Sequence, residues 1–226
     1  MTANIVFEFF LRGGPIMWPI LICALVAVAV VGERAFWWMR ERGRRDPRKL
    51  EQILAALENN DIAAAKTAAA GSEDAVIRVI HHGLEHVGHA HGSLLGALQL
   101  SAGIELKRAG RFLMVMDTLV TLAPLLGLLG TVTGLMKAFL NIGSAELSVS
   151  GVTGGIGQAL IATACGLGIA IFSLIPFNYF TSKVAQLQFD LETAATNVEV
   201  LVGGGAKTGD TVHLRKPESP GQATAH

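Results

Sequence analysis

Three long stretches without a charged residue most constrain what this chain can fold into. They cover residues 13–32, 118–136 and 147–182. Because a lipid bilayer satisfies no backbone hydrogen bond, a helix that crosses it needs about 20 mostly apolar residues. The composition agrees, since 51% of the residues are hydrophobic and only 16% are charged, against about 25% in soluble proteins. The sequence therefore predicts an all-α polytopic membrane protein with three transmembrane helices.

The distribution of Lys and Arg predicts how these helices are oriented. Twelve of the 18 basic residues lie between Arg34 and Arg111, and four follow the third stretch, whereas only Arg12 and Lys137 lie on the opposite side. Such an excess of positive charge is typical of loops that stay in the cytosol. We therefore expect the N-terminus in the periplasm and the C-terminus in the cytosol. Because the basic residues follow the first stretch, it lacks the charge order of a cleaved signal peptide.

This orientation divides the chain into eight segments. They are an outer interfacial segment, 1–12; transmembrane helix one, 13–38; a cytosolic helical segment, 39–111; transmembrane helix two, 112–140; a periplasmic loop, 141–150; transmembrane helix three, 151–178; a cytosolic helical extension, 179–202; and a flexible tail, 203–226.

The cytosolic segment contains signals for several helices. Asp46 and Pro47 favour a helix start, a second helix is expected after Asp61, and another after Ser72. From Ser93 an apolar helical pattern continues toward Phe112 without a proline, so we expect a long cytosolic helix that runs on into span two. A similar stripe after residue 176 predicts that span three also extends into the cytosol.

Small residues repeat along one face of spans two and three. In span two they are Ala123, Gly127, Thr131, Gly134 and Ala138; in span three they are Gly155, Ala159, Thr163, Gly166, Ala170 and Ser173. Two interpretations fit this pattern. Small faces let membrane helices approach closely, with each threonine hydroxyl bonded to its own helix. Alternatively, the faces line a cavity for another helix or for water, with both threonines near the middle of the bilayer.

Spans two and three resemble those of one membrane-protein family. The segments APLLGLLGTVTGLMKAF, residues 123–139, and GIGQALIATACGLGIAIFSLIPFNYF, residues 155–180, are similar to the MotA/TolQ/ExbB proton-channel family, and closest to its ExbB and TolQ branch. The segment GGPIMWPILICALVAVAVVGER, residues 13–34, resembles the first span of that branch. The resemblance covers roughly residues 13–202. MotA itself is the poorer match, because its pattern has four spans.

The resemblance implies a channel-forming stator subunit of the bacterial inner membrane that takes part in biopolymer transport. Five copies would surround the spans of a dimeric ExbD or TolR-like partner, and ions moving down a proton or sodium gradient would drive the motor. By their position in the motif, Thr131 and Thr163 match the threonines that line the ion path of the family. It implies no cofactor. A non-conducting membrane scaffold for a partner complex is the alternative.

Gln158 departs from the family pattern, which commonly has glutamate just before the A-L-x-x-T-A motif. An amide can accept or donate a hydrogen bond but cannot carry a proton near neutral pH. The three uncharged stretches hold no carboxylate, so the resemblance implies that an aspartate on the partner's span is the titrating group. Gln158 would then organise water near the outer end of the path. The alternative is that it bonds to a neighbouring helix.

Other candidate sites are weaker. The histidines at positions 81, 82, 86, 89 and 91 form a polar cluster, which we interpret as solvated or helix-ending residues, with a metal or pH-sensing role as the alternative. Asp117 is expected at the cytosolic edge of span two. Cys23 and Cys165 lie in apolar runs and predict neither a disulfide nor a metal site. No nucleophile and base pattern indicates an enzyme, and equal numbers of acidic and basic residues argue against a nucleic-acid partner.

Overall fold

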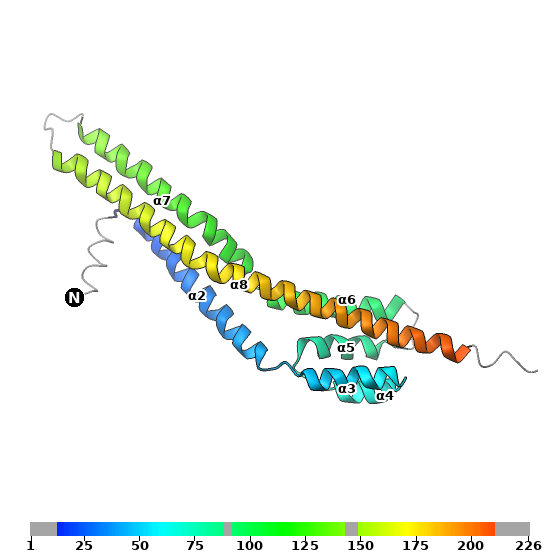
Figure 1. Ribbon diagram of the computed structural model, residues 1–226. Helices are drawn as coiled ribbons and strands as arrows, with labels where there is room; N and C mark the ends of the chain where they lie inside the picture. Colours follow the sequence, from blue (N-terminus) through cyan, green and yellow to red (C-terminus); the bar gives the residue numbers. More distant parts are fainter. Residues whose placement is uncertain (1–12, 88–91, 143–148, 211–226) are drawn as a thin grey trace, which may run out of the picture. The chain divides into compact units, whose positions relative to one another are not determined.

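The computed structural model describes residues 13–87, 92–142 and 149–210, and these residues form helices and short turns (Figure 1). The predictions for the outer segment 1–12, for residues 143–148 of the loop and for residues 211–226 of the tail lie outside the described residues. The helices are α2, Met17–Arg42; α3, Pro47–Glu58; α4, Ile62–Ala69; α5, Ala75–Glu85; α6, Gly92–Ala109; α7, Leu113–Ile142; and α8, Val149–Asp210. The predicted all-α class is confirmed.

Three of the described helices are long and apolar enough to cross a membrane: α2, α7 and α8. Each overlaps one of the three uncharged stretches, so the predicted number of candidate spans is confirmed. Many of their large apolar side chains are exposed, including Leu25 of α2, Leu125 of α7 and Ile171 of α8. Because such faces are unfavourable in water, lipid or neighbouring protein must cover them.

The chain folds as two compact units. The first contains α2, α7 and the part of α8 up to Ala185. In its core α2 packs against α8 through Met17, Ile20 and Ala162. It also packs against α7 through Cys23, Ala27 and Leu119. Both cysteines are free thiols within this apolar packing.

The expected continuous helix from Ser93 into span two is interrupted. The helix α6 ends at Ala109 and α7 begins at Leu113. Between them Phe112 adopts a left-handed conformation, with a φ of 64°. A non-glycine residue with a positive φ ends a right-handed helix, because the backbone can no longer continue its hydrogen-bond pattern. Span three, by contrast, extends without a break to Asp210, beyond the expected end at residue 202.

Arg34 of α2 holds this interruption in place. The side chain is fully buried, at 1% exposure. Its Nη1 donates to the carbonyl oxygens of Arg108 and Ala109, each at 3.2 Å, and its Nε and Nη2 bind the carboxylate of Glu33. The guanidinium also stacks over the rings of Trp37 and Phe112. The last carbonyls of a helix have no partner within it, so Arg34 caps α6 and joins its end to α2.

The second unit contains α3, α4, α5, the part of α6 up to Lys107 and the part of α8 from Gln186, whereas the end of α6 from Arg108 belongs to the first unit. Aspartates begin three of its helices: Asp46 accepts from the backbone nitrogen of Lys49, Asp61 from that of Ala64, and Asp74 from that of Val76. The sequence predicted the first two, whereas for the third it predicted only a start after Ser72. These side chains occupy N-cap positions, where a carboxylate satisfies a free backbone donor. Asp74 also accepts a hydrogen bond from the backbone of Asp46, so one buried carboxylate connects the starts of α3 and α5.

Candidate functional site

Helices α7 and α8 approach each other through their small residues. A Cβ atom built at Gly166 would lie 2.5 Å from the carbonyl oxygen of Ala123, and one at Gly134 would lie 2.9 Å from that of Gly155. Real side chains do not come this close to backbone atoms, so any larger residue would push the helices apart. The predicted small residues at this contact are Ala123, Gly127, Gly134, Ala138, Gly155, Ala159 and Gly166. Ala170, the remaining predicted residue, is buried in α8.

The face of α7 that meets α8 differs from the predicted stripe at one position. Gly130, rather than Thr131, occupies the middle of the contact, because a Cβ there would lie 2.4 Å from the Cβ of Ala162 and 3.1 Å from Ile16. Thr131 lies beside this contact on a more exposed part of the helix. The sequence carried a signal for Gly130, since positions 123, 127, 130 and 134 also repeat at steps of 4, 3 and 4.

Both threonine hydroxyls donate their protons to backbone carbonyls. Thr163 Oγ1 donates to the carbonyl oxygen of Gly127 across the helix contact, at 3.0 Å, and is 3.3 Å from that of Ala159. Thr131 Oγ1 donates to Leu128 at 2.7 Å within its own helix. A hydroxyl whose proton is engaged still presents oxygen lone pairs. Each threonine can therefore accept a hydrogen bond or coordinate a cation.

Gln158 lies on the side of α8 that faces α2. Its amide is so close to Gly14 that a Cβ there would lie 1.6 Å from Nε2. Gly14 also has a φ of 72°, a conformation that residues with a side chain rarely adopt. Ala162 and Cys165 on the same side of α8 pack with α2. This arrangement favours the alternative in which Gln158 contacts a neighbouring helix of its own chain.

The acidic residues of the spanning helices lie outside the uncharged stretches. Glu33 follows the first stretch and pairs with Arg34. Asp117 is exposed on the first turns of α7, and its carbonyl oxygen accepts from the hydroxyl of Thr121. Ser173 of α8 is an uncharged polar residue. It is fully buried, and its hydroxyl has no hydrogen-bond partner among the described residues. The polar groups within the uncharged stretches are therefore neutral ones, namely hydroxyls, side-chain amides and backbone groups.

The histidine cluster divides between different environments. His81 and His82 of α5 line a cavity that also contains Arg78 and Glu105. His86 Nδ1 lies 2.9 Å from the carbonyl oxygen of His82, which suits a helix-ending residue. The histidines at positions 89 and 91 lie outside the described residues. Within residues 13–87, 92–142 and 149–210, no group of three or more potential ligands is arranged to hold a metal ion.

The chain matches known proteins over most of its length. Residues 71–193 match the model of the MotA/TolQ/ExbB proton channel family. The chain belongs to this family. Two ExbB-like biopolymer transport proteins of Synechocystis sp. are 31% and 34% identical to it, over 85% and 76% of this chain and 77% and 83% of their own lengths. The biopolymer transport protein ExbB of Neisseria gonorrhoeae is 42% identical over 34% of this chain and 36% of its own.

The family match agrees with the fold. This is an ExbB-branch, multi-pass membrane protein of a biopolymer transport family, and the family is one of channels rather than enzymes. The matched region includes α7 and most of α8, the helices whose small residues meet. The candidate site is therefore the part of α7 and α8 around Gly127, Thr131 and Thr163.

Proposed function

We propose that this chain is an ion-conducting stator subunit of an ExbB-like motor in the bacterial inner membrane. Several copies, five by the family resemblance, surround the span of an ExbD or TolR-like partner. The proton gradient, or a sodium gradient, drives the motor, which energises transport or another process of the cell envelope. The N-terminus and the loop 141–150 are periplasmic, and the C-terminus is cytosolic, as the distribution of basic residues favours.

The observation that carries this proposal is the hydrogen bonding of the Thr131 and Thr163 hydroxyls. The hydroxyl of Thr163 bridges α7 and α8 through Gly127, and that of Thr131 is bonded within α7. Each oxygen can accept a hydrogen bond from water or from a protonated carboxylic acid, and each can coordinate Na⁺. Polar oxygens in the apolar part of a spanning helix are typical of ion pathways.

The titrating group belongs to the partner. The uncharged stretches contain no carboxylate, and the Gln158 amide neither binds nor releases a proton near neutral pH. A carboxyl group on the partner's span, between Thr131 and Thr163, would exchange protons while the hydroxyls hold water or the acid in position. In this proposal Gln158 organises water near the outer end of the path, and the proximity of its amide to Gly14 supports the alternative role of holding the start of α2.

A non-conducting scaffold is the second candidate function. The close contact between α7 and α8 supports it, because Gly127, Gly134, Gly155 and Gly166 are used in packing within one chain. A scaffold needs this packing but does not need the threonine hydroxyls to face an ion. The two functions therefore differ in what they require of Thr131 and Thr163.

Replacement of both threonines by valine distinguishes the two functions. Valine keeps the shape and removes the oxygen. If each lost hydrogen bond to water or ion costs about 1 kcal/mol, we expect ion flux through the assembled complex to fall about 30-fold in the Thr131→Val, Thr163→Val variant. The measurement is ion flux in proteoliposomes that contain the purified complex.

The matched control is Thr118→Val, a threonine of the same helix whose hydroxyl also bonds back to a carbonyl, that of Met114, at 2.8 Å. It should leave the flux within about twofold, as expected for an exposed substitution. Oligomer size is measured for each variant. Unchanged function in an intact double variant would favour the scaffold.

A further inference from the structure

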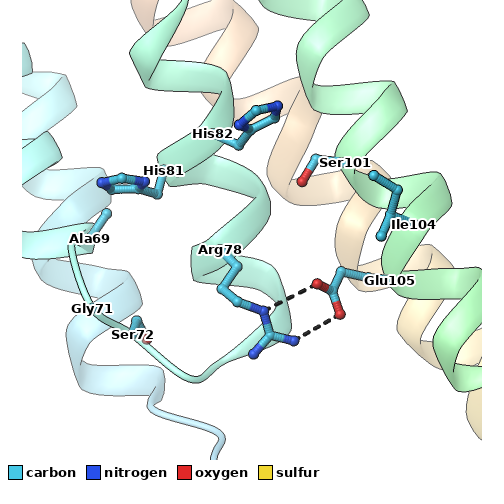
Figure 2. Close-up of a pocket in the computed structure, with 9 residues that line it drawn as sticks. All are labelled: Ala69, Gly71, Ser72, Arg78, His81, His82, Ser101, Ile104 and Glu105. Carbon is cyan, nitrogen blue, oxygen red and sulfur yellow. Dashed lines mark hydrogen bonds and ion pairs between the residues drawn. The ribbon is translucent and has the colours of Figure 1, made fainter.

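The second unit contains a cavity that the proposed ion path does not use. It has a volume of about 320 Å³, the space of about ten water molecules, and lies between α5, α6 and the turn that follows α4. Figure 2 shows Arg78, His81 and His82 projecting from α5, and Ser101 and Glu105 from α6. These residues all belong to the same compact unit. The cavity is large enough for a small molecule.

The carboxylate in the lining is already neutralised. Arg78 Nε and Nη2 bind the two oxygens of Glu105 at 3.1 and 2.8 Å (Figure 2). Such two-point pairs are strong and geometrically specific, and the Glu105 side chain is 8% exposed. Glu105 therefore contributes little repulsion toward an anion in the cavity.

The other polar groups of the lining retain hydrogen-bonding capacity. His81 and Ser101 have no hydrogen bond or ion pair within the described part of the chain. Ser101 is unusual in this respect, because Thr67, Ser182 and Thr196 each return their hydroxyl to the carbonyl four residues earlier. Its hydroxyl is therefore available to a molecule in the cavity.

Ser72 adds to this capacity. Its oxygen accepts from the backbone of Asp74 at 3.3 Å, which leaves its own proton to donate. Lys49 does not line the cavity, and its Nζ donates to the carbonyl oxygen of Ala70. The groups that remain are mainly hydrogen-bond donors, and a ligand rich in acceptors would satisfy them.

We propose that this cavity binds a phosphate group. Phosphate oxygens accept several hydrogen bonds at once, and the hydroxyls of Ser72 and Ser101 and the imidazole of His81 can donate to them. The Arg78 guanidinium is already engaged by Glu105 and by the carbonyl oxygen of Glu73. The group can belong to a water-soluble phosphate compound or to the head of a lipid. The residues that line this cavity do not belong to α7 or α8, so phosphate binding can be tested independently of the proposed function.

Calorimetric titration of the full-length protein in detergent micelles tests the site, with inorganic phosphate as the probe. Sodium chloride keeps the ionic strength constant. We expect a Kd of about 1 mM at pH 6. A short-chain phosphatidic acid tested beside it identifies the source: tighter binding than inorganic phosphate by about tenfold indicates a lipid head, and equal or weaker binding indicates a soluble compound.

Variants show whether the cavity holds the phosphate. His81→Ala and Ser101→Ala, alone and together, should weaken binding, by about tenfold or more for the pair. His86→Ala is the matched control, because this histidine lies on α5's end and does not line the cavity; it should change the Kd less than twofold. Absence of phosphate binding at about 20 mM and pH 6 would overturn the proposal. So would binding that the His81 and Ser101 variants leave unchanged, with helix content confirmed by circular dichroism.

Discussion

The Gly166→Ala variant should lose about 3 kcal/mol of stability, although it adds a single methyl group. The new Cβ would lie 2.5 Å from the carbonyl oxygen of Ala123 and 3.2 Å from two backbone atoms of Gly127. Backbone atoms within a helix cannot turn aside as a flexible side chain can, so α7 and α8 must separate. Separation also weakens the hydrogen bond from Thr163 to Gly127. Unfolding in detergent micelles, followed by tryptophan fluorescence and circular dichroism, measures the loss.

Gly168→Ala provides a matched control two residues along the same helix. No atom lies within 4 Å of the position that its Cβ would take. Because alanine favours a helix more than glycine does, this variant should be unchanged or up to about 1 kcal/mol more stable. Equal effects at the two positions would contradict the close contact between α7 and α8.

The second large effect is expected at Arg34. The Arg34→Met variant keeps much of the apolar stem but leaves the carbonyl oxygens of Arg108 and Ala109 without their donor and Glu33 without its partner. Each unsatisfied buried group costs about 1–3 kcal/mol, and the lost stacking on Trp37 and Phe112 adds to this. We expect about 3 kcal/mol of lost stability. Hydrogen exchange should rise first at the backbone amides between α6 and α7.

Two further substitutions separate the geometry of Arg34 from its charge. Arg34→Lys should lie between the wild type and Arg34→Met, because an ammonium keeps the charge but cannot bind Glu33 at two points and also reach the carbonyls. Arg40→Gln, at an exposed position of the same helix, should change stability by less than about 0.5 kcal/mol. Slow exchange between α6 and α7 in Arg34→Met would show that Arg34 does not hold the interruption.

Much of this fold could be predicted from the sequence because its main signals are local. An uncharged stretch of sufficient length has few alternatives to a spanning helix, so α2, α7 and α8 fell where they were expected. Asp46 and Asp61 cap helices because a carboxylate before a helical pattern satisfies free backbone donors wherever the helix later packs.

The rest depends on contacts between distant residues. Gly130 and Thr131 both lie near the small face of α7, and the packing of Ile16 and Ala162 decides which of them faces α8. The break at Phe112 was not predicted, because the apolar pattern continues through it and the group that caps α6 is Arg34, more than seventy residues away in sequence. From the sequence alone, Arg34 indicates only the orientation of span one, as one of the basic residues that follow it.

The candidate site was predicted to a similar extent. The spacing of small residues identified the faces of α7 and α8, but periodicity gives no information about the helix that each face meets. Gln158 shows this limit most clearly. The sequence leaves two roles open for it, a place in the ion path or a contact with a neighbouring helix, and only the packing brings its side chain against Gly14, just before α2. The left-handed conformation of Gly14, which makes this contact possible, has no unique signal in a Gly-Gly-Pro segment.

Ion flux into proteoliposomes tests the proposed function most directly. Three preparations are compared under an imposed proton or sodium gradient: this chain alone, the chain with its single-span partner, and the chain with a partner whose span aspartate is changed to asparagine. We predict flux only from the second, because the uncharged stretches of this chain hold no carboxylate. Flux from this chain alone, or undiminished flux with the asparagine variant, would contradict an ion path completed by the partner's acid.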